Sequence, residues 1–178
     1  MRFYKTAVFI LIITFFTGCF LFDSNNSEEV KKIKEGDAFF ASGEIDKAVG
    51  SWEESLDIKK TAAAYEKMII AHIVKNDLSG AEQWLKEGLV HFPDNVNLIF
   101  NASLISYHKN EYQLALKDID RVLDADMYYP NAHYMKGMIY EKLGNDKEAK
   151  KEFVNAININ PGSRATWEKI REEVKNGK

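Results

Sequence analysis

Four stretches of the chain share one pattern of apolar, small and polar positions. They read SGEIDKAVGSWEESL (42–56), KNDLSGAEQWLKEGL (75–89), KNEYQLALKDIDRVL (109–123) and LGNDKEAKKEFVNAI (143–157). In each stretch a turn former precedes apolar residues at three- and four-residue steps, the spacing of an amphipathic helix. The aligned alanines lie 33, 34 and 34 residues apart, at Ala48, Ala81, Ala115 and Ala149. The pattern predicts two helices in each period and an all-α fold.

Each period also contains a turn residue between its two helices. In periods one and four, a small residue of the first helix is paired with an aromatic residue of the second. The turn between the two helices holds Gly43, Asn76, Asn110 and Gly144 in the four periods. Gly and Asn accept the left-handed backbone conformation that such turns need. The first helices of periods one and four carry Gly36 and Gly137, and the second helices carry Trp52 and Phe153. We expect the small residue to let the paired helices approach and the aromatic ring to fill the gap opposite.

This pattern resembles the tetratricopeptide repeat, a helix–turn–helix unit of 34 residues, over about residues 29–163. The repeats fall at about 29–61, 62–95, 96–129 and 130–163. Repeats two and three depart from the family pattern at the small first-helix position, which holds Ile69 and Ser103. The resemblance implies a domain over residues 28–178, a right-handed superhelical solenoid of about four repeats. Residues 164–176, with Trp167, Ile170 and Val174 as an apolar stripe, are expected to form a C-terminal capping helix.

The N-terminus has the composition of a targeting segment. Arg2 and Lys5 precede the apolar run Thr6–Phe16, which is shorter than the roughly 20 residues of a membrane-spanning helix. Small residues and then Cys19, the only cysteine, follow the run. A basic start, a short apolar run and a small-residue cleavage site predict a secretory signal peptide over residues 1–18. A lone cysteine excludes an internal disulfide.

Residues 16–19, Phe-Thr-Gly-Cys, resemble the bacterial lipoprotein signal, although Phe16 and Thr17 depart from its usual residues. The resemblance implies cleavage before Cys19, a covalent lipid on that cysteine and a tether over residues 19–27. It also implies a lipid-anchored location in the bacterial cell envelope. Phe20 stands where an Asp favours retention in the inner membrane, which favours the outer membrane and its periplasmic face. The alternative is an ordinary signal peptide or membrane anchor with an incidental cysteine.

The net charge and the spacing of the potential metal ligands argue against several classes of function. Removing residues 1–18 takes away two of the 24 basic residues and none of the 27 acidic ones, which leaves a net charge of −5. This mild acidity without a basic patch argues against nucleic acid as a partner. The spacing between the histidines is not that of metal ligands. The four residues are His72, His91, His108 and His133. The acidic group Asp118, Asp120, Asp124 and Asp126 lacks the glycine turn of a calcium loop. We expect no enzyme, no metal and no cofactor besides the lipid on Cys19.

In the tetratricopeptide repeat family the first helix of each repeat lines a concave groove. In repeats two and three the groove positions include Glu66, Ile70, Ile73, Val74, Asn97, Phe100 and Leu104. The implied partner-binding residues are Ile33, Phe40, Ile73, Phe100, Leu104, Tyr107, Tyr134 and Met138. Exposed apolar patches mark interaction sites. The alternative is that Ile70, Ile73 and Val74 are core residues of a tightly wound stack. The same alternative applies to Phe100, Tyr107 and Tyr134. Family members that clamp a C-terminal carboxylate use five polar groove residues, and only Asn101 matches that set.

Two functions of different kinds follow from the sequence. The first is an adaptor or scaffold that holds a segment of another envelope protein in its groove and reaches the membrane through the lipid. The second is a substrate-binding or structural envelope protein whose groove takes a small hydrophobic ligand or mediates self-association.

Overall fold

The computed structural model describes residues 27–129 and 131–163, and every regular element in those ranges is helical. The elements are α2 (Glu28–Ala41), α3 (Ile45–Ile58), α4 (Ala62–Val74), α5 (Leu78–His91), α6 (Val96–His108), α7 (Tyr112–Ala125), α8 (Ala132–Lys142), α9 (Asp146–Ile159) and the 3-10 turn η2 (Pro161–Ser163). The predicted all-α fold of helix–turn–helix repeats is confirmed. The predicted signal peptide, Cys19 and the capping helix 164–176 lie outside the described residues.

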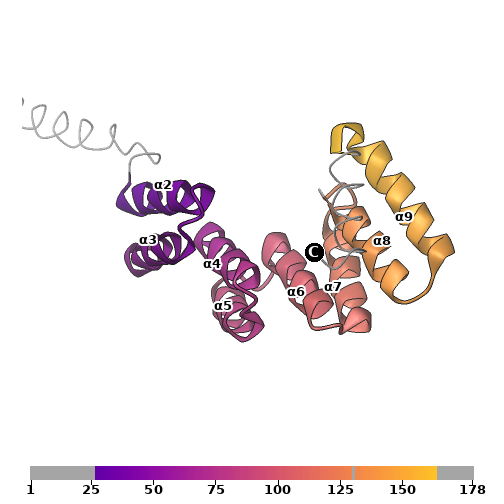
Figure 1. Cartoon of the computed structure of the whole chain (residues 1–178), viewed down its shortest axis with the longest axis horizontal. Coiled ribbons are helices and arrows are strands. Elements are labelled where there is room, and N and C mark those ends of the chain that lie inside the picture. Colours follow the sequence, from indigo (N-terminus) through magenta and orange to yellow (C-terminus); the bar gives the residue numbers. More distant parts are fainter. Residues whose placement is uncertain (1–26, 130, 164–178) are drawn as a thin grey trace, which may run out of the picture. The chain divides into compact units, whose positions relative to one another are not determined.

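The chain divides into two compact units. Unit 1 ends at Lys59 and contains α2 and α3, and unit 2 begins at Lys60 and contains α4 to α9. Figure 1 shows consecutive helices as antiparallel pairs joined by tight turns: α2 with α3, α4 with α5, α6 with α7, and α8 with α9. Within unit 2, α5 also packs on α6, α7 packs on α8, and α4 packs against α6. The right-handed sense of the superhelix stays a prediction.

The four predicted turn residues all have a left-handed backbone. The φ angles are +82° at Gly43, +56° at Asn76, +63° at Asn110 and +75° at Gly144. In the first turn, the N–H of Glu44 donates to the carbonyl of Phe39 (2.9 Å) and the N–H of Gly43 donates to that of Phe40 (3.0 Å). The other three turns repeat this pair of hydrogen bonds. This is the Schellman motif, which ends a helix and reverses the chain while it satisfies the last carbonyls.

Small residues set the distance between paired helices, as predicted. A Cβ on Gly36 would lie 2.4 Å from Nε1 of Trp52, and one on Gly137 would lie 2.6 Å from the ring of Phe153. The indole N–H of Trp52 donates to the carbonyl of Ile33 (3.2 Å) and so ties the ring to α2. The aromatic ring can therefore lie directly against the backbone of the partner helix.

The two middle repeats solve the same packing problem differently. In repeat two the glycine is on the second helix, and a Cβ on Gly88 would lie 3.1 Å from the side chain of Tyr65 on α4. In repeat three the fully buried Ser103 replaces glycine, and its hydroxyl donates to the carbonyl of Phe100 (2.7 Å). Each departure from the family pattern thus has a local compensation.

We predict that Gly36→Ala lowers the free energy of unfolding by about 1–3 kcal/mol, because the new methyl group would collide with Trp52. Gly50→Ala is the matched control in the partner helix α3. Apart from its chain neighbours and the backbone of α3 itself, no atom lies within 4 Å of a Cβ at Gly50, so the substitution should add about 0.5–1 kcal/mol of stability. Urea denaturation of the two variants and the wild type measures both effects. Equal stability of the two variants would contradict the packing described here.

Candidate functional site

The first helices of unit 2 carry an apolar surface at the positions that the family resemblance assigns to the groove. We define the first-helix face by Glu66, Ile70, Ile73 and Val74 of α4 and Asn97, Phe100 and Leu104 of α6. The residues of each helix recur at three- and four-residue steps, so they lie along one side of it. The face is continuous across two repeats because α4 packs against α6.

The exposed apolar side chains of this face are on α4. Ile70 is 40% exposed and Val74 is 59% exposed, one helical turn apart. Ile73 beside them, and Phe100 and Leu104 on α6, are half-buried. The sequence left open whether Ile70, Ile73 and Val74 belong to the core. Ile70 and Val74 lie at the surface instead.

Three of the predicted groove residues lie in the hydrophobic core instead. Tyr107, Tyr134 and Met138 are each less than a tenth exposed and belong to one cluster of buried side chains. The ring of Tyr107 lies 5.6 Å from that of Tyr112 in α7, and the ring of Tyr134 lies 5.4 Å from that of Phe153 in α9. The second helices thus cover these rings. A contact of these three residues with a partner stays a prediction.

The remaining two predicted groove residues are in unit 1. Ile33 and Phe40 are half-buried on α2. The ring of Phe40 lies 5.6 Å from that of Trp52, so it extends the packing between α2 and α3.

A polar group lies at one end of the first-helix face. The hydroxyl of Tyr129 donates to Oδ1 of Asn97 (2.8 Å), and the side chain of Asn97 lies close enough to the carboxylate of Glu66 to act on its pKa. The ring of Tyr129 lies 5.2 Å from that of Phe100. The loop after α7 thereby connects the carboxylate of α4 to the aromatic part of the face.

Burial changes the acidity of this group. It raises the pKa of Glu66, although the side chain of Asn97 and the charge of Lys67 act the other way. Burial also raises the pKa of Tyr129 to about 12, and the charges of Glu66 and Asp126 add to this effect. The ionised form of Glu66 is therefore less favourable here than in water. The sequence placed Glu66 at a groove position but did not indicate this partial burial.

Two histidines serve the packing of helices. The indole N–H of Trp84 donates to Nε2 of His72 (3.1 Å), and Nδ1 of His72 lies 2.8 Å from Oδ2 of Asp77. An indole N–H can only donate, so Nε2 is the acceptor and Nδ1 carries the hydrogen toward Asp77. Both nitrogens of this ring are occupied within the repeat, which assigns His72 a structural role.

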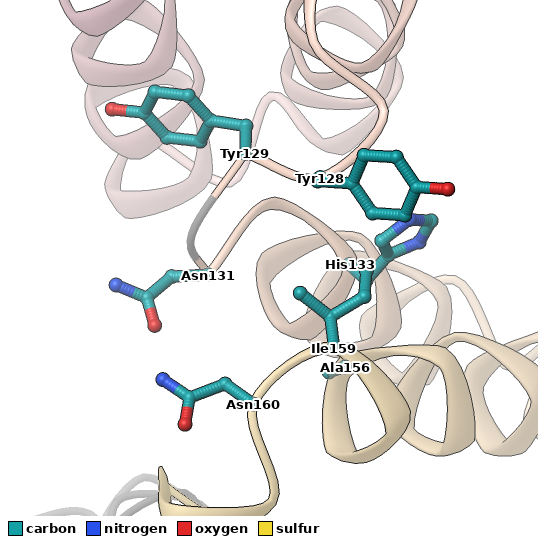
Figure 2. Close-up of a pocket in the computed structure, with 7 residues that line it drawn as sticks. All are labelled: Tyr128, Tyr129, Asn131, His133, Ala156, Ile159 and Asn160. Carbon is teal, nitrogen blue, oxygen red and sulfur yellow. The ribbon is translucent and has the colours of Figure 1, made fainter.

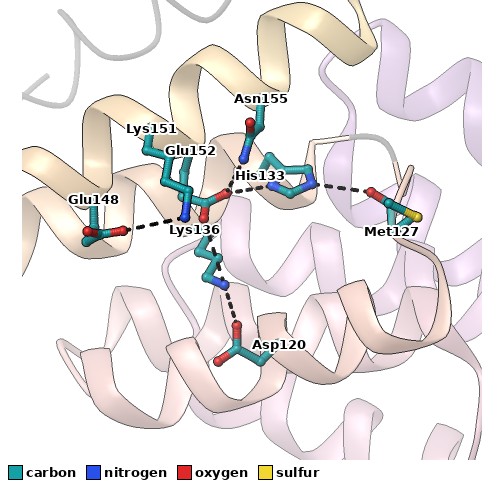
Figure 3. A network of polar contacts seen from close by, with 8 residues as sticks. All are labelled: Asp120, Met127, His133, Lys136, Glu148, Lys151, Glu152 and Asn155. Carbon is teal, nitrogen blue, oxygen red and sulfur yellow. Dashed lines mark hydrogen bonds and ion pairs between the residues drawn. The ribbon is translucent and has the colours of Figure 1, made fainter.

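The second histidine belongs to a charged network between α7, α8 and α9 (Figure 3). Nδ1 of His133 lies 2.6 Å from Oε2 of the buried Glu152, and Nε2 lies 3.2 Å from the carbonyl of Met127. Lys136 pairs with Asp120 at 2.7 Å and lies 4.0 Å from Glu152. The network joins three helices and the loop before α8. Within residues 27–129 and 131–163, no group of three or more His, Cys, Asp or Glu could hold a metal ion.

A small cavity of about 180 Å³ lies beside this network (Figure 2). Its lining residues are Tyr128, Tyr129, Asn131, His133, Ala156, Ile159 and Asn160. Figure 2 shows the Tyr128 ring near the His133 ring, while the amides of Asn131 and Asn160 extend from the α7–α8 loop and the end of α9. Pockets for small molecules usually measure roughly 300–1,000 Å³, so this cavity is too small for a typical ligand.

None of the helices in the described part of the chain has the length and apolarity to cross a membrane.

Comparison with known proteins identifies the repeat. Residues 130–163 match the family described as tetratricopeptide repeat. This segment, the fourth helix–turn–helix unit of the chain, is similar to a tetratricopeptide repeat. A TPR repeat-containing protein of Methanocaldococcus jannaschii is 24% identical over 148 residues, which are 77% of this chain and 26% of that protein. The chain therefore spans about a quarter of the length of this curated relative.

Solved structures share the fold at low sequence identity. PilF of Pseudomonas aeruginosa has a TM-score of 0.70 and 17% identity, over 85% of this chain and 73% of that chain. YrrB, described as a TPR protein with an unusual peptide-binding site, has a TM-score of 0.60 and 16% identity, over 79% of this chain and 72% of that chain. Tetratricopeptide repeats are in general interaction modules without enzymatic activity, and nothing among the described residues points to catalysis.

The raised pKa of Glu66 predicts that Glu66→Gln stabilises the protein at neutral pH. The folded state binds the Glu66 proton more tightly than the unfolded state, so the wild type loses stability as the pH rises above the ordinary pKa of 4.5. The Gln variant does not titrate there, and its advantage should disappear below that pH. Denaturation at acidic and neutral pH tests this, with the exposed Glu53→Gln as control. A Gln variant that is less stable than the wild type at neutral pH would refute it.

Proposed function

We propose that the chain is a lipid-anchored scaffold of the bacterial cell envelope whose repeats hold a segment of another envelope protein. The N-terminal pattern that ends in Cys19 supports the anchor and, with Phe20 after it, the outer membrane and its periplasmic side. The tetratricopeptide repeats support the role of an interaction module.

One observation carries the binding role. Ile70 and Val74 expose 40% and 59% of their surface next to each other, and the half-buried Phe100 and Leu104 extend the apolar area on α6. Apolar surface in water costs free energy, roughly 25 cal/mol for each Å² that a partner could cover. Adjacent exposed apolar side chains on the groove side of a repeat array therefore favour a docking role over a purely structural one. The peptide-binding site described for YrrB, which shares the fold, supports a polypeptide as the partner.

The anchor follows from the chemistry of the thiol. A thiolate can accept a diacylglyceryl group, and the new N-terminus can accept a further acyl chain. A single acyl chain holds a protein at a membrane only weakly, and two or more give stable attachment. The polar residues after Phe22 in the tether would then keep the repeats at a distance from the lipid.

The alternative functions are binding of a small hydrophobic ligand and self-association. The cavity beside Tyr128 is too small for a typical small-molecule ligand. Self-association through the first-helix face would use the same exposed residues, so the experiment below is designed to separate it from binding of a different protein.

We predict that an Ile70→Ser and Val74→Ser double variant loses a partner in a chemical-crosslinking pull-down from native envelopes. The control is a Val90→Ser and Leu114→Ser double variant, which removes side chains that are 73% and 45% exposed on the second helices. Circular dichroism checks that both variants remain helical. A partner that is lost only from the first variant supports the scaffold function. Recovery of the same proteins with both variants would refute the scaffold function. Recovery of only further copies of this chain would favour self-association.

We predict that Cys19→Ser abolishes metabolic labelling with palmitate and releases the chain from the membrane fraction. The matched control places a thiol elsewhere in the tether by adding Ser24→Cys to the Cys19→Ser variant, and it should also stay unlabelled. Mass spectrometry of the purified protein gives the N-terminal residue and its lipid. A wild type that is unlabelled and retains residues 1–18 would contradict the lipoprotein assignment and favour a membrane anchor.

A further inference from the structure

We propose that the segment bound by the first-helix face is basic and apolar, with two apolar side chains against Ile70 and Val74 and a Lys or Arg side chain against Glu66. The inference rests on the proposed function, since it names the chemistry of the partner at the same surface. It goes beyond that function because the scaffold role alone predicts no charge for the partner.

The geometry of α4 sets the spacing of the three contacts. Glu66, Ile70 and Val74 follow one another at steps of four residues along one side of the helix. Side chains four residues apart on a helix have Cβ atoms about 5–6 Å from each other. A partner would therefore present one charged and two apolar side chains in a row with a similar spacing.

The surroundings of Glu66 favour a cation. The polar side chain beside it, Asn97, is a neutral amide, which accepts a hydrogen bond from the neutral hydroxyl of Tyr129. Burial is the largest influence on Glu66 and outweighs the nearby charge of Lys67. A partly desolvated carboxylate gains more from an additional cation than an exposed one does, because the pair interacts at a lower effective dielectric constant.

A second carboxylate adds negative charge beside this polar group. The charges of Glu66 and Asp126 both raise the pKa of Tyr129. These two carboxylates therefore favour a basic segment over an acidic one at this end of the first-helix face.

The test selects a random peptide display library on the full-length chain, purified in detergent. We expect the wild type to enrich peptides that combine Lys or Arg with two apolar residues. Exchange of the basic residue for Glu should weaken binding of a selected peptide by at least about tenfold. Glu66→Lys should reverse the preference to Asp or Glu, and Glu66→Gln should remove it while the apolar preference remains. Glu53→Lys, an equal change of net charge on an exposed residue of α3, should keep the preference of the wild type.

The outcomes separate this inference from the proposed function. Peptides without a basic preference, or with the same preference in wild type and Glu66→Lys, would overturn the inference. If binding of those peptides still requires Ile70 and Val74, the scaffold function stands. If no selected peptide depends on Ile70 and Val74, the inference and the proposed function both fail.

Discussion

The close approach of the two helices in each repeat is the constraint on which the rest of the structure depends. Trp52 and Phe153 lie against Gly36 and Gly137, where there is no room for a Cβ, and Tyr65 lies against Gly88, where a Cβ would make a tight contact at 3.1 Å. Helices this close can be joined only by a sharp reversal, which the left-handed Gly and Asn residues supply. A single pair leaves one side of its apolar surface uncovered, so each pair in unit 2 packs on the next. The first helices α4 and α6 thereby come to lie against each other.

This stacking decides which apolar residues remain available to a partner. Toward the C-terminal end of unit 2 the aromatic residues Tyr107 and Tyr134 are covered by rings from α7 and α9. On α4, Ile70 and Val74 remain at the surface, on the same side of the helix as the partly buried Glu66. A carboxylate whose ionised form is unfavourable lowers the stability of the fold. Its presence beside exposed apolar residues is therefore more readily explained by recognition of a partner than by folding.

Sequence alone could predict the features that depend on neighbouring residues in the chain. The left-handed turns at Asn76 and Asn110 follow from a residue preference, and the match of Gly36 with Trp52 follows from the repeat alignment. The burial of Tyr107 and Met138 could not be predicted, because it depends on how the second helices and the next repeat cover them. The link from Glu66 through Asn97 to Tyr129 crosses more than 60 residues of sequence, and no local pattern indicates it. The charge network around Glu152 is likewise a product of packing between three helices.

The central claim is that the side of α4 that carries Val74 binds a different protein in the cell envelope. Incorporation of a photocrosslinking amino acid at Val74, and separately at Val90, tests it most directly in living cells. Both positions are exposed, at 59% and 73%, but Val90 is on the second helix α5. The account predicts a covalent adduct with another envelope protein from position 74 and none from position 90. Equal adducts from both positions, or none from position 74, would contradict it.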